Sequence, residues 1–269
     1  MVVMEPAFRE VAGRRLFTLH FRPTCPPRLS VLVLPPFAEE MNKSRRLLAE
    51  TARTLTLQGC EVLVPDLSGT GDSAGSFGEV TWPDWCEEVA TLARQFHGAA
   101  GAGAPALLAI RSGALFLHVS GLVANARVVA WQPVFDGERL LQQFMRLRVM
   151  AAKFAGRDES IAWMKSELTA GRSVEIAGYP LGPALSEGFA AARLDPATLA
   201  AAARTTLLEV RTGGDATPTP PFSRFAAAAT SCGAVVETRV VSAEQFWTSQ
   251  EIAAPGAVTA ATCTALLED

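Results

Sequence analysis

The chain has 269 residues, of which 49% are hydrophobic, enough to bury a full-sized core within one α/β unit. Its formal net charge is −3, and no basic run is interleaved with aromatic residues, which argues against nucleic-acid binding. No stretch reaches the roughly 18 apolar residues that span a bilayer, and residues 1–15 lack the apolar segment of a secretory signal. We therefore expect a cytoplasmic protein with no membrane span.

Short apolar runs alternate with helical patterns along the first half of the chain. This alternation is typical of a mostly parallel sheet with helices on both faces. The predicted elements are a strand at 16–21, a strand at 30–34, a helix at 42–58, a strand at 61–64, a helix at 82–96, a strand at 106–110, a helix at 113–124 and a strand at 128–131.

The pattern changes after residue 135. Residues 136–200 predict helices and a short hairpin near 174–179, which indicates a cap inserted between strands of the sheet. The core then comprises 1–135 and 201–269, and its later elements are a strand at 207–210, a helix at 221–231, a strand at 235–241 and a helix from 258. This order predicts the α/β-hydrolase fold, with the nucleophile turn of that fold at 110–113.

The nucleophile turn requires small residues two positions before and two positions after its central residue, because two backbones pass close together there. Centring the turn on Arg111 puts Ala109 and Gly113 at these crowded positions. Centring it on Ser112 puts Ile110 at one of them, and a β-branched side chain fits poorly. We therefore predict Arg111 at the tip of the turn, with Ser112 as the alternative.

An arginine at the tip changes the chemistry that the turn can perform. Its guanidinium only donates hydrogen bonds and cannot attack a carbonyl carbon, but it can bind an anion or pair with a carboxylate. The chain has three histidines, and none follows residue 118, whereas this fold keeps its catalytic histidine after the last strand. The sequence therefore predicts no standard Ser-His-Asp triad.

The loop after the strand at 30–34 supplies the next candidates. The backbone N–H of Phe37 or Ala38, together with that of Ser112, would face an oxyanion in this fold. Glu39 and Glu40 follow directly, and either could face the arginine and act as a base or only hold it in place. The alternative for both acids is favourable charge at the start of a helix.

The remaining pocket candidates follow later strands. Gln132 comes after the strand at 128–131, and Phe246, Trp247 and Glu251 come after the strand at 235–241. We expect these four side chains to contact a substrate, with core packing as the alternative for the two aromatics. The five cysteines are widely spaced, so no disulfide framework, metal site or other cofactor is predicted, and most are expected to be buried.

Several segments together resemble the exosortase A system-associated hydrolase 2 family of α/β hydrolases, over residues 17–252. They are PPFAEEMNKSRR at 35–46, GTGDS at 69–73, WQPV at 131–134, GY at 178–179 and the aromatic pair at 246–247 with QEI at 250–252. Members are named for bacterial exopolysaccharide and protein-sorting gene clusters. Their turn commonly reads Gly-x-Arg-x-Gly, which implies Arg111 as the centre, although Ala109 departs from that pattern.

The resemblance implies a hydrolase acting on an ester, thioester or acyl group, with a small-molecule, acyl or saccharide ligand as partner. The family name rests on the fold, so a non-catalytic pseudo-hydrolase that binds a ligand or assembles with a partner is the alternative. The sequence leaves a homodimer open.

Overall fold

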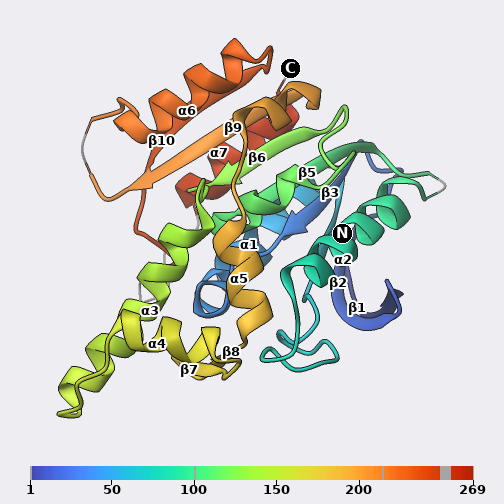
Figure 1. Cartoon of the computed structure of the whole chain (residues 1–269). Helices are drawn as coiled ribbons and strands as arrows, with labels where there is room; N and C mark the ends of the chain where they lie inside the picture. Colours follow the sequence, from blue (N-terminus) through green and yellow to red (C-terminus); the bar gives the residue numbers. More distant parts are fainter. Residues whose placement is uncertain (1, 100, 214, 249–255, 269) are drawn as a thin grey trace.

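Eight strands form one sheet in the order β1-β2-β4-β3-β5-β6-β9-β10 (Figure 1). The structure is a computed structural model, which describes residues 2–99, 101–213, 215–248 and 256–268. The strands are β1 (Val2–Val11), β2 (Arg14–Pro23), β3 (Leu29–Leu34), β4 (Cys60–Pro65), β5 (Ala104–Ile110), β6 (Arg127–Trp131), β9 (Arg204–Arg211) and β10 (Val236–Ser242). β2 pairs antiparallel with β1 and with β4, and the other neighbours are parallel. This confirms the predicted mostly parallel α/β-hydrolase sheet.

Helices cover both faces of the sheet, because the central strands are apolar on both sides. Alternate residues of β3 enter different cores: Leu32 and Leu34 pack in one, and Val31 and Val33 in the other. α1 (Glu39–Leu57) and α7 (Gly256–Leu267) cover the second of these cores, while α2 (Trp82–His97) and α6 (Pro220–Ser231) contribute to the first. No helix in the described ranges is long and apolar enough to cross a membrane.

The segment between β6 and β9, which we call the cap segment (residues 136–200), lies outside the sheet. It contains α3 (Gly137–Phe154), α4 (Ile161–Thr169), the hairpin of β7 (Val174–Ile176) and β8 (Tyr179–Leu181), α5 (Pro183–Ala191) and all but the last residue of the 3₁₀ helix η2 (Pro196–Ala201). The ring of Phe37, in the loop after β3, lies 5.1 Å from the ring of Phe144 and 4.5 Å from that of Phe189. The cap segment is thereby anchored over the end of β3.

Two elements differ from the prediction. β1 lies outside the predicted strands, because most of its residues are exposed and Pro6 and charged side chains interrupt the apolar pattern. The helix predicted at 113–124 is instead the 3₁₀ helix η1 (Arg111–His118), followed by turns in which Gly121 has a φ of 75°. A glycine in that conformation does not continue a right-handed helix.

The cysteines are less buried than predicted. Cys60 and Cys263 are buried and Cys86 is half-buried, but Cys25 and Cys232 are exposed, so the expectation was wrong for these last two. Burial raises the pKa of the Cys60 thiol to about 11 and that of Cys86 to about 12. Neither of these two thiols is activated as a nucleophile.

Candidate active site

Arg111 occupies the tip of the sharp turn between β5 and η1. Its φ is 53°, in the left-handed region where a non-glycine residue is uncommon. Two positions on, a Cβ atom placed at Gly113 would lie 2.1 Å from the carbonyl oxygen of Leu34, so only glycine fits there. Two positions before, Ala109 is fully buried between neighbouring strands. The crowding that the sequence indicated at these two positions is present, and it sets the register of the turn.

The guanidinium of Arg111 is held on three sides. Its Nη2 donates to Oε1 of Glu40 at 2.9 Å, and its Nε lies 3.2 Å from both oxygens of that carboxylate. Its Nη1 donates to the backbone oxygen of Gln132 at 3.1 Å, and its central carbon lies 4.5 Å from the centre of a Trp247 ring. Arg111 is only 8% exposed, so the ion pair with Glu40 is largely shielded from water.

Gln132, directly after β6, connects the turn at Arg111 to β9. Its φ is 40°, its backbone N–H donates to Leu208 at 2.7 Å, and its Oε1 accepts from the N–H of Val210 at 2.7 Å. The side chain thus bridges the ends of β6 and β9, and the backbone oxygen is left to face Arg111. The contact of Gln132 with a substrate stays a prediction; within the protein, its backbone oxygen accepts a hydrogen bond from Arg111 and its side chain bonds to Val210.

A cavity of about 250 Å³ lies beside Arg111, between α1 and α3. α1 contributes charged side chains to its wall, Glu39, Glu40 and Lys43, with the Nζ of Lys43 4.0 Å from Oε1 of Glu39. Its other wall is largely apolar, lined by Phe37, Leu140, Gln143, Phe144, Leu147, Trp247 and Thr248. The cavity can therefore take a small ligand with an apolar part and a polar or anionic group.

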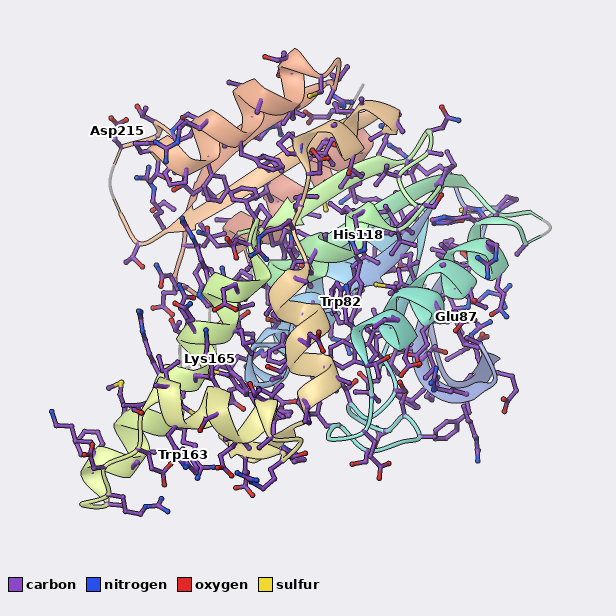
Figure 2. All side chains as sticks on the ribbon, viewed as in Figure 1. Trp82, Glu87, His118, Trp163, Lys165 and Asp215 are labelled. Atoms are coloured by element: carbon purple, nitrogen blue, oxygen red, sulfur yellow. The ribbon has the colours of Figure 1, made fainter. Side chains whose placement is uncertain are left out.

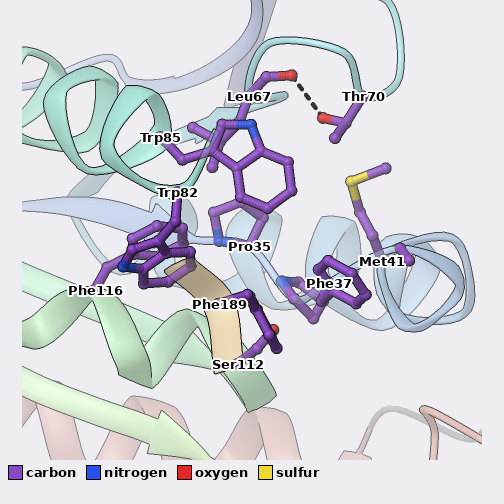
Figure 3. Close-up of a pocket in the computed structure, with 12 residues that line it drawn as sticks. Pro35, Phe37, Met41, Leu67, Thr70, Trp82, Trp85, Ser112, Phe116 and Phe189 are labelled. Atoms are coloured by element: carbon purple, nitrogen blue, oxygen red, sulfur yellow. Dashed lines mark hydrogen bonds between the residues drawn. The ribbon is translucent and has the colours of Figure 1, made fainter. Parts of the chain in front are cut away.

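The space above Ser112 is much smaller. A cavity of about 10 Å³ lies there, and Figure 3 shows Ser112 with aromatic side chains crowded around this cavity. The backbone positions expected to hold an oxyanion, Phe37, Ala38 and Ser112, all line it. Because about 10–15 Å³ is needed for a single water molecule, this cavity has no room for a reacting ester. Ser112 itself is 2% exposed.

The three histidines, all within the described residues, have partners other than Ser112. His20 pairs with Glu61 at 3.1 Å, and His97 lies 3.0 Å from the backbone oxygen of Ser30; burial lowers the pKa of each ring. His118 bonds to the backbone oxygen of Leu115 and stacks on Trp82; Figure 2 labels both rings. No hydrogen bond in the described part of the chain joins the hydroxyl of Ser112 to a histidine.

In this fold the acid of the triad often follows the strand that corresponds to β9. The acid at that position in this chain is Asp215, and it stabilises a turn. Asp215 follows β9 in an exposed loop, on the side of the molecule away from α2 (Figure 2). Its Oδ1 accepts from the backbone N–H of Thr217 at 3.1 Å, which stabilises the turn. Among the described residues, no cluster of three His, Cys, Asp or Glu side chains could hold a metal ion.

The predicted residues after β10 separate into two groups. Both aromatics are buried in the same core, but only Trp247 also stacks on the arginine and lines the cavity, whereas the ring of Phe246 lies 5.6 Å from that of Trp131. Glu251 lies outside the described residues. Lys43 and the residues of α3 were not predicted; Lys43 could have been found, because it lies one helical turn after Glu39. The α3 residues carry no such signal, since sequence does not tell where a cap lies over a sheet.

Comparison with known proteins supports the fold. No protein-family model and no curated protein sequence matches the chain. Among solved structures, Est1E from Butyrivibrio proteoclasticus with bound ferulic acid has a TM-score of 0.60 at 14% identity, covering 91% of this chain and 92% of that one. An esterase from Pyrococcus furiosus has a TM-score of 0.59 at 15% identity, covering 92% and 84%. The mouse alpha/beta hydrolase domain-containing protein 10 has a TM-score of 0.55 at 14% identity, covering 88% of each chain. The chain therefore has the α/β-hydrolase fold.

Proposed function

We propose that this chain acts on an ester, thioester or other acyl group at a site centred on Arg111 and Glu40, without a Ser-His-Asp triad. The observation that carries the proposal is the position of the ion pair. Arg111 occupies the tip of the turn where this fold presents its nucleophile, and its partner Glu40 shares the wall of the cavity of about 250 Å³. Beside a substrate-sized cavity, a carboxylate can accept a proton from water, and a guanidinium can hold the negative charge that develops on the substrate oxygen.

Ser112 is not the nucleophile in this proposal. Its hydroxyl lies in the cavity of about 10 Å³, and a serine needs an adjacent base to attack a carbonyl carbon. The larger cavity contains a carboxylate and a guanidinium instead. A carboxylate can activate a water molecule, and a guanidinium can hold the negative charge that develops on a carbonyl oxygen.

The reaction then follows from these two groups. Binding of the substrate carbonyl to Arg111 loosens the ion pair and frees the oxygens of the Glu40 carboxylate to meet a water molecule. Glu40 takes a proton from water while the water oxygen attacks the acyl carbon, and Arg111 holds the resulting oxyanion. Collapse of this intermediate releases an alcohol or thiol, which takes the proton from Glu40, and leaves a carboxylic acid.

The resemblance of the sequence to hydrolases of exopolysaccharide systems extends the proposal to the substrate. An acyl group on a precursor of a cell-surface polysaccharide has a carbonyl for Arg111 and an apolar part for the α3 wall of the cavity. The mixed lining, charged on α1 and apolar on α3, suits such a molecule.

Turnover of a panel of p-nitrophenyl esters and acyl thioesters tests the proposal, with Glu40→Gln as the variant. We expect this change to lower kcat by ~10²–10⁴-fold, because glutamine keeps a hydrogen bond to the arginine but cannot accept the proton of water. Glu50→Gln is the matched control: it removes a half-buried carboxylate paired with Arg46 on the same helix and leaves turnover unchanged. Full activity of Glu40→Gln would refute the role of Glu40.

A second candidate is a binding protein that performs no reaction. The closed ion pair favours it, because three guanidinium contacts occupy the carboxylate of Glu40, and these must open before the carboxylate can meet a water molecule. This candidate predicts no turnover with the whole panel, together with saturable binding of a carboxylate or phosphate ligand that Arg111→Met abolishes.

A further inference from the structure

The outer face of α3 carries an exposed apolar stripe. Leu147, Met150 and Phe154 are spaced i, i+3 and i+7, so they share one face of the helix. They are 44%, 59% and 90% exposed. Figure 1 shows α3 running outward from the sheet, with α4 and the β7–β8 hairpin beside it.

From Leu147 outward, this stripe is separate from the face with which α3 packs on the rest of the molecule; Leu140, on the same line of the helix seven residues earlier, is buried and lines the cavity beside Arg111. Leu141, Met145 and Ala152 are buried, and they lie on the opposite side of the helix. A surface helix normally turns one apolar face inward and a polar face to water. The outer half of α3 has a second apolar face, on which Met150 and Phe154 are left exposed by the described part of the chain.

A row of cations borders the stripe. Arg139, Arg146 and Lys153 recur every seven residues and therefore lie along one line of the helix. Arg139 pairs with Asp136 at 3.8 Å, whereas in the described part of the chain neither Arg146 nor Lys153 forms an ion pair. The only acid of α3 is Glu138, at its inner end, where it pairs with Lys165. An occupant of this face must therefore be apolar where it meets the stripe and anionic along the cations.

We propose that the outer face of α3 docks on an anionic membrane surface. A helix lying in the lipid interface combines an apolar face with flanking Lys and Arg side chains that reach the anionic headgroups. A twofold contact with a second copy of the chain suits the face less well, because the cation rows of both copies would come to the rim of one interface with no acidic row to meet them.

The position of the stripe relative to the cavity supports a lipid surface as the occupant. Leu147 belongs to both: it begins the exposed stripe and also lines the cavity beside Arg111. Docking by α3 would place the mouth of that cavity at the membrane surface, where it could receive a ligand carried by lipid. The proposal itself concerns binding and holds whether or not the Arg111 site is catalytic.

Vesicle co-sedimentation of the full chain tests the proposal, using phosphatidylcholine vesicles with and without about a third phosphatidylglycerol. We expect binding to the anionic vesicles only, weakened by added salt. Met150→Ser with Phe154→Ser should reduce binding roughly tenfold or more, because the apolar contact with the interface is lost. Leu57→Ser is the control, since Leu57 is 69% exposed on α1 and lies outside the stripe.

The cations are tested in the same way. Arg146→Gln with Lys153→Gln should reduce binding roughly tenfold, whereas Arg53→Gln on α1 should leave it unchanged. No binding of the unaltered protein to anionic vesicles, or an equal loss with Leu57→Ser, would overturn the proposal. It would also be overturned if sedimentation velocity showed a dimer that Met150→Ser with Phe154→Ser dissociates, because the face would then be a contact between copies.

Discussion

Replacing Arg111 by methionine is expected to lower kcat/KM by ~10²–10³-fold for any ester or thioester that the unaltered protein hydrolyses. Methionine fills a similar volume but cannot hold a negative charge on the substrate oxygen. Ser112→Ala is expected to stay within about threefold of the unaltered protein, because the serine lies outside the cavity where the reaction is proposed. Steady-state kinetics on the same substrate measures both changes.

Two further variants separate this effect from a general loss of structure. Arg14→Met removes an arginine that pairs with Asp84 at 2.7 Å, away from the cavity, and should leave kcat/KM unchanged. Arg111→Met leaves the carboxylate of Glu40 without its partner, so the double variant with Glu40→Gln should unfold at higher denaturant than Arg111→Met alone. An active Arg111→Met variant, or an inactive Ser112→Ala variant, would show that the turn works through its serine.

Gly113→Ala is expected to destabilise the fold by about 3 kcal/mol or more. The added Cβ would lie 2.1 Å from the carbonyl oxygen of Leu34 and 2.7 Å from its carbon, so the backbone of β3 or of the turn must move. The free energy of unfolding, from urea titration followed by circular dichroism, measures this change.

Gly121→Ala is the matched control for the turn. Gly121 has a φ of 75° with no atom within 4 Å of the added Cβ, so alanine there costs only backbone strain, about 1–2 kcal/mol. A Gly113→Ala variant no less stable than Gly121→Ala would mean that the strand and the turn are not packed as closely as described. The position of Arg111 at the tip would then lose its main structural support.

The fold could be predicted from local pattern because its strands are buried on both faces. The apolar runs at 30–34, 106–110 and 128–131 each coincide with a central strand. The small residues at 109 and 113 indicated which residue lies at the tip of the turn. Both signals arise from close packing, which restricts the residue types at each position whatever the reaction. β1 gave no such signal, since an edge strand with exposed residues on both faces needs no apolar pattern.

The site was predictable only in part. The sequence placed Glu39 and Glu40 near the arginine. Which of the two pairs with Arg111 depends on which side of the first turn of α1 faces the end of β5, and in the structure it is Glu40. Phe246 and Trp247 are adjacent, chemically alike and both buried, yet only Trp247 covers Arg111. Such choices depend on contacts between segments far apart in the sequence, which no local pattern records.

Labelling with a fluorophosphonate probe tests the central claim most directly, because such a probe reacts with a serine that an adjacent base activates. The protein is incubated with the probe, and the modified peptide is identified by mass spectrometry, with Ser112→Ala alongside. An Arg111-centred site predicts no adduct on Ser112 under conditions that fully label an ordinary serine esterase. Stoichiometric modification of Ser112, abolished in Ser112→Ala, would contradict the claim.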